Sequence, residues 1–351
     1  MMNTTNLLLC IVCLSLFSCR KDDPPGGPVA ENCTVNLTLK APTGFELTKR
    51  STVNFNGGLS ELQFVDDQQG YLLGRSTAGS YAALFKTVDG GSTWTDLGLS
   101  AKVNPINLFF LTDKIGFISY DEATTSLLKT TDGGQSWTTL TYPDLVGNLY
   151  HLQKDNQDNL YAIASNANTS TVLVKSTDQG TTWKIINNSP ELGFSLITFS
   201  FKIVGSQIYI SGKNGKILVT DLDGKLNSTL QTTVSGIWDL AVIDPQHLVV
   251  AGTGQTIKSS DGGTTWQTIY DRSARLLDFV SANEGLMILN KSYCDTDVYQ
   301  ANDVLGYTSN GGTIWQESAE ATNTLIRFVD SQPISGSLIF VIGTDVYTLR
   351  R

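Results

Sequence analysis

Five segments of the chain share a short pattern with an acidic or amide residue at the same position. Carboxylates that recur in this way could act as general acids, general bases or cation ligands. In each segment this residue precedes a glycine by two positions and a tryptophan by five, as in KTTDGGQSW at Lys129–Trp137. A carboxylate in such a turn accepts N–H bonds from its own backbone. The pattern therefore predicts structural carboxylates, and we assign no catalytic residue and no metal ligand.

The other residues of the pattern also have mechanical roles. Glycine adopts the positive φ that a side chain would penalise, a serine or threonine ends the incoming strand, and the tryptophan packs its large apolar face against a neighbour. The residues expected to build these turns are Asp89, Gly91, Trp94, Asp132, Gly134, Trp137, Asp178, Gly180, Trp183, Asp261, Gly263, Trp266, Asn310, Gly312 and Trp315.

This unit, [Ser/Thr]-x-Asp-x-Gly-x-x-Trp, resembles the Asp-box of the bacterial neuraminidase repeat. Successive tryptophans are 43, 46 and 49 residues apart, with one double gap of 83 residues after Trp183. Leu226 stands in place of the missing tryptophan in VTDLDGKL, where Asp221 keeps the acidic position. A period in the forties with short strands is typical of β-propeller blades.

The segments before the boxes support this interpretation. ELQFVDDQQGYLLG, INLFFLTDKIGFIS and LLDFVSANEGLMIL each contain an apolar strand, a polar turn and a second apolar strand, without helical periodicity. We predict one all-β propeller of seven four-stranded antiparallel blades, with six as the alternative count. The last unit has only three strands, so an N-terminal strand within Val35–Lys40 or Phe45–Arg50 is expected to close the ring.

The combination F-V-D…G-Y/F…K-T-x-D-G-G-x-x-W, repeated over essentially the whole mature chain, resembles the photosystem II assembly and stability factors. The resemblance implies a seven-bladed propeller and a role as an assembly factor for a membrane protein complex. Related repeats occur in sialidases and xyloglucanases, so an Asp-box glycoside hydrolase is a further alternative. The chain lacks the Phe/Tyr-Arg-Ile-Pro segment of sialidases and has too few arginines to identify their triad.

The N-terminal segment predicts export and lipidation. The apolar run Leu7–Phe17 is too short to span a bilayer and ends at Ser18-Cys19, which resembles a bacterial lipobox. We expect a signal peptide over 1–18, a lipidated Pro/Gly linker from Cys19 over 19–32, and the propeller over 33–351. An ordinary signal peptide cut nearby is the alternative. The following KDD tract resembles a surface-export signal, so we expect an outer-membrane lipoprotein at the cell surface or on the periplasmic side.

Two cysteines, Cys33 and Cys294, remain in the mature chain, where they could form a disulfide or stay as unpaired thiols. The net charge of −9 argues against nucleic-acid binding. We expect membrane contact only through the lipid, no cofactor and a monomeric protein.

A binding face is expected opposite the boxes, because the first and third turns of a four-stranded meander share one face and the second turn lies on the other. Aromatic, arginine and aspartate side chains in those opposite loops suit sugars or peptides, and ordinary loop decoration is the alternative. The candidates are Arg75, Tyr81, Tyr120, Asp121, Tyr142, Arg272 and Arg275.

Other polar residues carry weaker signals. His151 and His247 are 96 residues apart, and His151 is expected to be a satisfied inner-strand residue. The insertion Tyr293–Asp303 holds three aspartates that suit either a calcium site or a polar loop. Together these observations predict a non-catalytic propeller that binds or scaffolds a glycan or a protein.

Overall fold

The structure is a computed structural model. It describes residues 38–39, 41, 44–76, 82–99, 104–120, 124–166, 171–192, 200–279, 281–292, 301–317, 319–320, 328–334 and 337–350. The chain separates into two units, Met1–Cys33 and Thr34–Arg351, and every described residue belongs to the second unit. The predicted leader, Cys19, Cys33, Cys294, Tyr81, Asp121 and residues 293–300 of the insertion lie outside the described residues.

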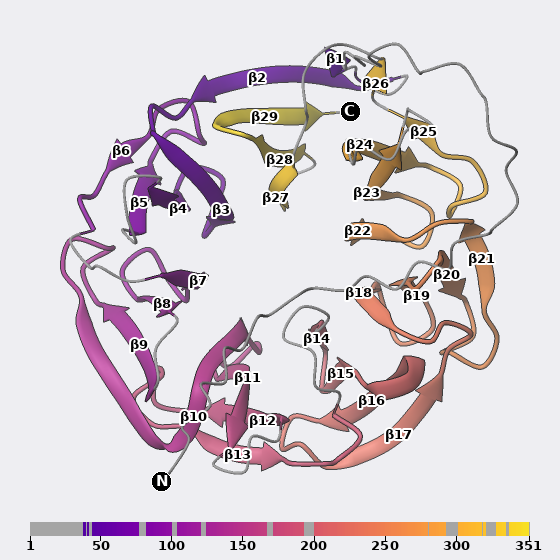
Figure 1. Cartoon of the computed structure of the whole chain (residues 1–351), viewed down its shortest axis with the longest axis horizontal. Helices are drawn as coiled ribbons and strands as arrows, with labels where there is room; N and C mark the ends of the chain where they lie inside the picture. The colour runs from indigo at the N-terminus through magenta and orange to yellow at the C-terminus, as the bar shows by residue number, and fades with distance from the viewer. Residues whose placement is uncertain are drawn as a thin grey trace, which may run out of the picture. The chain divides into compact units, whose positions relative to one another are not determined.

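Within the second unit the described elements are β-strands, apart from one 3-10 turn, η1 (Lys213–Gly215). Five sheets are four-stranded antiparallel meanders arranged in a ring (Figure 1). They comprise β3 (Gly57–Phe64), β4 (Gly70–Ser76), β5 (Ala82–Thr87) and β6 (Thr95–Asp96); β14 (Phe201–Val204), β15 (Gln207–Ser211), β16 (Lys216–Asp221) and β17 (Leu226–Gln231); β18 (Ile237–Val242), β19 (Leu248–Gly252), β20 (Gln255–Ser259) and β21 (Gln267–Tyr270); β22 (Ala274–Phe279), β23 (Gly285–Ser292), β24 (Ala301–Thr308) and β25 (Gln316–Glu317); and β27 (Phe328–Ile334), β28 (Ser337–Ile342), β29 (Asp345–Arg350) and β2 (Glu46–Thr52).

The sixth sheet has seven strands, and a separate pair lies beside the ring. The seven strands are β7 (Pro105–Phe110), β8 (Gly116–Tyr120), β9 (Thr124–Thr130), β10 (Thr138–Lys154), β11 (Leu160–Asn166), β12 (Thr171–Ser176) and β13 (Lys184–Asn187). The pair is β1 (Thr38–Leu39) with β26 (Ala319–Glu320).

The predicted count of seven blades is wrong: the described strands form a six-bladed propeller, which was the alternative count. The difference comes from β10, a single strand of 17 residues that spans the end of one repeat unit and the start of the next. Its first part pairs with β9, where Thr138 faces Lys129, and its last part pairs with β11, where Lys154 faces Leu160. Because β10 continues from one repeat unit into the next, two units join into one seven-stranded blade.

Closure by an N-terminal strand is confirmed. Strand β2 pairs with β29 from Glu46 opposite Arg350 to Thr52 opposite Asp345. The Lys49 ammonium also lies 2.8 Å from an Asp345 carboxylate oxygen. This pairing covers the edge of β29, which would otherwise offer unpaired N–H and C=O groups to another chain.

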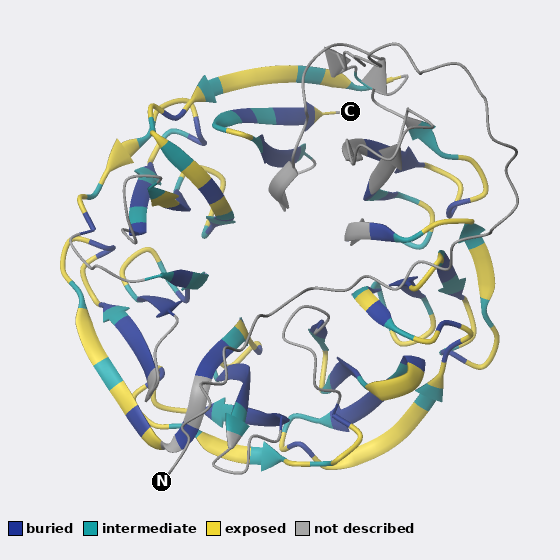
Figure 2. Cartoon of the chain, in the orientation of Figure 1, coloured by how far each residue is buried: buried dark blue, intermediate teal, exposed yellow. Residues whose placement is uncertain are grey.

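The core lies between neighbouring blades rather than at one centre. Figure 2 shows buried residues on the middle strands of the blades and exposed residues along outer strands such as β2 and β17. One apolar cluster, for example, joins Tyr209 and Val219 of one blade to Leu240 and Leu248 of the next. In the part of the chain that the structure describes, no helix has the length and apolar character needed to cross a membrane.

Candidate functional site

The five segments 87–94, 130–137, 176–183, 259–266 and 308–315, called box turns below, hold their acidic residues with local hydrogen bonds. At Asp132, one carboxylate oxygen accepts the Ser136 N–H at 2.9 Å and the Thr130 hydroxyl at 2.7 Å. The other oxygen accepts the Ser136 hydroxyl at 2.5 Å. These bonds, led by the Ser136 hydroxyl, lower the pKa of Asp132 to about 2. Such a carboxylate stays ionised at neutral pH and is unsuited to donating a proton.

The fifth box turn shows which of these bonds the turn requires. The Asn310 side-chain oxygen accepts the Ile314 N–H at 2.9 Å and the Thr308 hydroxyl at 3.0 Å. An amide has no second acceptor oxygen, and the residue in the place of Ser136 is Ile314, which has no hydroxyl and is 63 % exposed. One acceptor oxygen is therefore enough to build the turn.

Three of the box-turn tryptophans reach toward the preceding outer strand, whereas the indole of Trp137 donates to the Gly134 carbonyl of its own turn at 3.1 Å. The indole N–H of Trp266 donates to the Gln231 carbonyl of β17, and that of Trp315 donates to the Ile269 carbonyl of β21. The indole of Trp94 donates to the Ser51 hydroxyl of β2 in the same way. The box turns thus join neighbouring strand groups around the ring.

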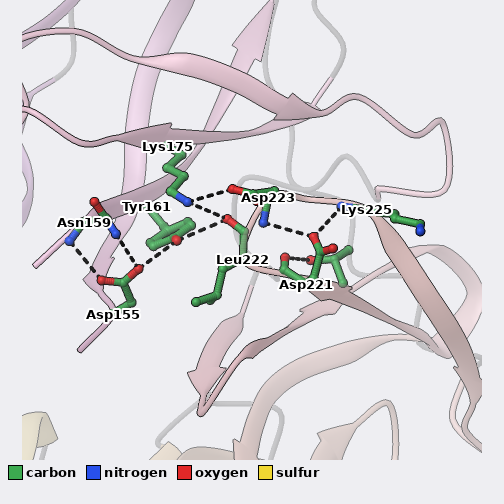
Figure 3. Close-up of polar contacts among 9 residues, drawn as sticks. Asp155, Asn159, Tyr161, Lys175, Asp221, Leu222, Asp223 and Lys225 are labelled. Atoms are coloured by element: carbon green, nitrogen blue, oxygen red, sulfur yellow. Dashed lines mark hydrogen bonds and ion pairs between the residues drawn. The ribbon is translucent and has the colours of Figure 1, made fainter. Parts of the chain in front are cut away.

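Lysines on the third strand of a repeat unit add a second link to the following turn. Figure 3 shows Lys175 between the Tyr161 ring and the turn that begins at Asp221. Its ammonium lies 2.9 Å from an Asp223 carboxylate oxygen, 3.1 Å from the Leu222 carbonyl and 5.4 Å from the Tyr161 ring centre. Lys129 likewise donates to the Gln179 carbonyl of the next box turn at 2.7 Å. Lys175 and Lys129, on the side of the box turns, therefore make structural contacts between neighbouring groups of strands.

Box turns lie beside the first turns of their own repeat units, as the meander geometry predicts. Gly90 N–H donates to the Gln68 carbonyl, and Gly311 N–H donates to the Asn283 carbonyl. The turns between the second and third strands therefore lie at the other ends of these strands, where the predicted binding face was placed.

The predicted binding-face residues have different environments. Tyr120 is buried at the end of β8, and Tyr142 is buried with its hydroxyl donating to the Gly180 carbonyl. Arg75, at the end of β4, and Arg272 are exposed, whereas Arg275 lies in β22. Among the described residues, no hydrogen bond or ion pair is seen between any two of these candidates. The shared binding face therefore stays a prediction.

A different set of polar residues links the innermost strands. The Glu61 carboxylate on β3 accepts hydrogen bonds from the Asn107 amide and the Leu108 N–H of β7. The Asn107 oxygen in turn accepts the Leu152 N–H of β10 at 3.1 Å. Each side chain precedes a buried leucine and bonds to the next inner strand, so these residues form a chain of contacts around the axis.

The same chain continues through the following blades. Gln153 on β10 donates to the Phe201 carbonyl and accepts the Ile203 N–H at 3.3 Å, which places β14 beside β10. The Ser200 hydroxyl then donates to Asp239 on β18 at 3.0 Å. The other oxygen of Asp239 accepts the Leu277 N–H of β22 at 2.8 Å.

Three exposed or half-exposed residues on this part of the ring, His151, Lys202 and Trp238, form what we call the inner-strand cluster. Trp238 is 45 % exposed and occupies the register shift of β18. His151 lies at a register shift of β10 with φ of 55° and is exposed, whereas the sequence predicted a satisfied inner-strand residue. Lys202 of β14 is half-exposed.

Electrostatics indicate that Lys202 and Asp239 lie near His151. Although water reaches His151, surrounding protein desolvates its ring and lowers its pKa, Asp239 opposes that shift, and Lys202 adds to it. A ligand can reach the His151 imidazole because part of its surface is accessible, whereas the surrounding protein sets the protonation state of the imidazole. His151 is therefore a neutral, accessible imidazole at neutral pH.

The only sequence signal for this cluster was Trp238, the one tryptophan outside the box turns. Metal binding finds no support in the described part of the chain, where no three His, Cys, Asp or Glu side chains are grouped to hold an ion. His247 instead pairs with Asp244, with 2.8 Å between Nδ1 and a carboxylate oxygen.

No family model and no curated protein sequence matches this chain. Among solved structures, YCF48 bound to D1 peptide shares 16 % identity with it, over 90 % of this chain and 100 % of that chain, with a TM-score of 0.64. YCF48 from Cyanidioschyzon merolae shares 13 % identity over 87 % of this chain and 98 % of that chain, also with a TM-score of 0.64.

A further match is the GH74 xyloglucanase from Xanthomonas campestris, with 12 % identity over 87 % of this chain but only 53 % of that chain, and a TM-score of 0.55. Identities this low establish the fold alone. The predicted resemblance to a photosystem II assembly factor, YCF48, is confirmed at the level of the β-propeller fold.

Proposed function

We propose that this propeller is a non-catalytic module that binds a segment of another protein through the inner-strand cluster. The observation that carries the proposal is Trp238, a large aromatic side chain that is 45 % exposed on an innermost strand. The equivalent register shifts of β3 and β7 hold Ser60 and Ile106, so the fold does not require an aromatic residue there. Exposed tryptophans are frequent anchors in protein interfaces.

The fold comparison supports binding, since one structurally similar propeller is described as bound to D1 peptide. A catalytic role as a glycoside hydrolase has weaker support. The inner-strand carboxylates of Glu61 and Asp239 accept backbone N–H bonds from neighbouring strands. Retaining and inverting glycosidases both use two carboxyl groups that act on the scissile bond. These two carboxylates act as structural links instead.

The test is a binding selection that uses this protein directly. Purified propeller is exposed to a display library of random heptapeptides and, in parallel, to an array of immobilised glycans. We expect enriched peptides whose affinity falls about tenfold or more in Trp238→Ala, as for an interface anchor. Leu226→Ala is the matched control, because Leu226 is also 48 % exposed but lies on the outer strand β17.

The possible outcomes separate the proposals. Glycan retention without peptide enrichment would replace the protein partner by a carbohydrate one. Equal loss of peptide binding in Trp238→Ala and Leu226→Ala would move the site away from the inner-strand cluster. Hydrolysis of any arrayed glycan by the wild-type protein would restore the enzyme alternative.

We also propose that lipidation at Cys19 tethers the propeller to the outer membrane, as an assembly or scaffolding factor for membrane-associated partners. The support is the Leu16-Phe17-Ser18-Cys19 pattern at the end of the apolar run. Fractionation of cells that express Cys19→Ala should show the protein released from the membrane fraction. Unchanged membrane retention of this variant would contradict the lipid anchor, and protease shaving of intact wild-type cells would distinguish the surface from the periplasm.

A further inference from the structure

The inner-strand cluster combines an aromatic face with two nitrogen-bearing side chains, and this combination narrows the chemistry of its ligand. We infer that Lys202, assisted by His151, binds a carboxylate of the partner segment, while Trp238 contacts an apolar side chain next to that carboxylate. The inference rests on the proposed function, because it specifies the ligand of the same surface.

The hydrogen bonds between inner strands place the three residues on one side of the ring. The Gln153 bonds hold β10 against β14 on either side of Lys202, at Phe201 and Ile203. The Ser200–Asp239 bond then holds β14 against β18, directly beside Trp238. His151, Lys202 and Trp238 therefore come from three successive inner strands.

Charge complementarity selects an anionic group. The ammonium of Lys202 supplies the positive charge, while Asp239 on β18 keeps its negative charge but is held by the Ser200 hydroxyl, the Leu240 N–H at 2.8 Å and the Leu277 N–H at 2.8 Å. These three donors occupy most of its acceptor capacity. Among the described residues, no hydrogen bond or ion pair joins the Lys202 ammonium to another side chain. A half-exposed ammonium in this position is available to a carboxylate from outside.

His151 contributes through its position as well as its ring. Its φ of 55° is uncommon for a residue with a side chain and takes it out of the regular ladder of β10. The equivalent residues before a buried leucine, Glu61 and Asn107, bond to the next inner strand, whereas His151 is exposed. An imidazole displaced in this way can donate a hydrogen bond to a ligand oxygen.

The test uses peptides that the wild-type protein enriches from the random library, resynthesised with a fluorescent label. Each peptide is made with its acidic residues or with Asn and Gln in their place, and with a free or an amidated C-terminus. Anisotropy titrations should show about tenfold weaker binding when the recognised carboxylate is removed. Loss of affinity in the Asn and Gln peptides identifies a side-chain carboxylate, whereas loss in the amidated peptides identifies the terminal one.

Variants of the protein assign the contact. We expect Lys202→Gln to weaken binding of the acidic peptides about tenfold while leaving the neutral peptides unchanged, and Lys202→Arg to restore most of the affinity. Lys184→Gln is the matched control, because Lys184 is an exposed lysine of the outer strand β13. His151→Gln keeps a donor and should have a smaller effect than His151→Ala.

Two results would overturn the inference while leaving peptide binding in place. One is equal affinity for acidic and neutral peptides, and the other is an equal loss of affinity in Lys202→Gln and Lys184→Gln. If no peptide binds the wild-type protein, the proposed function itself fails, and the inference fails with it. Thermal melts of all variants establish that the changes in affinity are not due to unfolding.

Discussion

The box turn at 130–137 and the turn at 220–226 occupy the same place in their repeat units, yet they hold the ring together differently. Both use an aspartate oxygen to accept the N–H four residues later, from Ser136 at 2.9 Å and from Lys225 at 2.9 Å. The first turn then ends in the half-buried Trp137, whereas the second ends in Leu226, which is 48 % exposed.

The second turn replaces the indole by close polar contacts with the preceding strands. The Asn187 side chain donates to the Gly224 carbonyl at 2.7 Å. This bond adds to a lysine link, from Lys175 to the Leu222 carbonyl, of the kind that Lys129 makes to the box turn at 176–183. The aspartate bond therefore defines the turn, while the contact between neighbouring groups of strands can be either aromatic or polar.

The largest expected effect comes from Gly224→Ala. Gly224 has φ of +79°, and an added Cβ would lie 2.3 Å from the Ile186 carbonyl oxygen, so both backbone strain and a clash with rigid backbone oppose the change. We expect a loss of about 2–5 kcal/mol in the free energy of unfolding, measured with urea. Gly98→Ala is the control, because Gly98 has φ of +62° and nothing within 4 Å of the added atom. Equal losses in both variants would show that the turn at 220–226 is not packed closely.

The next effect tests the aromatic join. Trp137 is half-buried against an apolar cluster that contains Phe110. Truncation of a fully buried aromatic residue costs about 3–5 kcal/mol, so Trp137→Ala should cost about 2–4 kcal/mol. Leu226→Ala should change stability by less than about 0.5 kcal/mol. If Trp137→Ala has the same melting temperature as the wild type, the indole does not contribute to the stability of the propeller.

A smaller effect, with a distinct dependence on pH, comes from converting the fifth turn into a full one with Asn310→Asp and Ile314→Thr. The pKa of Asp132 is lowered from 3.8 to about 2 in its own turn, so an aspartate at 310 should also have a lowered pKa. A carboxylate with a lowered folded-state pKa stabilises the protein above the unfolded pKa and loses this contribution as pH falls through the folded value.

The double variant should therefore melt at a higher temperature than the wild type at pH 7, with the difference shrinking between about pH 4 and pH 2. Calorimetry at both ends of this range is the measurement, and Asp132→Asn should show the opposite sign. A pH-independent difference would mean that the carboxylate charge is not what stabilises the turn.

The smallest effect is expected for Asp223→Ala. The Asp223 side chain is 86 % exposed, so its ion pair with Lys175 is screened by water and should contribute less than about 0.5 kcal/mol. Lys175→Met should cost more, because it also removes the donor to the Leu222 carbonyl. If added salt destabilised wild type and Asp223→Ala by very different amounts, the ion pair would be more important than its exposure indicates.

Much of this architecture could be predicted from local sequence. The placement of the boxes, their glycines at positive φ and the need for a closing strand all follow from short-range backbone constraints that a segment carries with it. The count of blades could not be predicted in the same way. Whether the chain turns or continues after Tyr142 depends on how β10 pairs with both β9 and β11, which are contacts between segments.

The candidate site was harder to predict for a related reason. Tyr142 looked like a loop residue in the sequence, but its hydroxyl reaches the carbonyl of Gly180, 38 residues away. His151 was expected to be a satisfied inner-strand residue, but it is exposed at a register shift of β10. Alternating patterns specify which residues can face a core, but a one-residue shift in register reverses that choice.

The repeated turn follows from local sequence, since each box carries its acceptor, its hydroxyl and its glycine within eight residues. The joining of two repeat units into one sheet, and the positions of His151, Lys202 and Trp238 on successive inner strands, arise from contacts between distant segments. Hydrogen bonds within a turn join residues two to four positions apart. The pairing of β10 with β9 and β11 joins separate strands, and the bonds between inner strands join residues 38 to 50 positions apart, so neither can be read from one short segment.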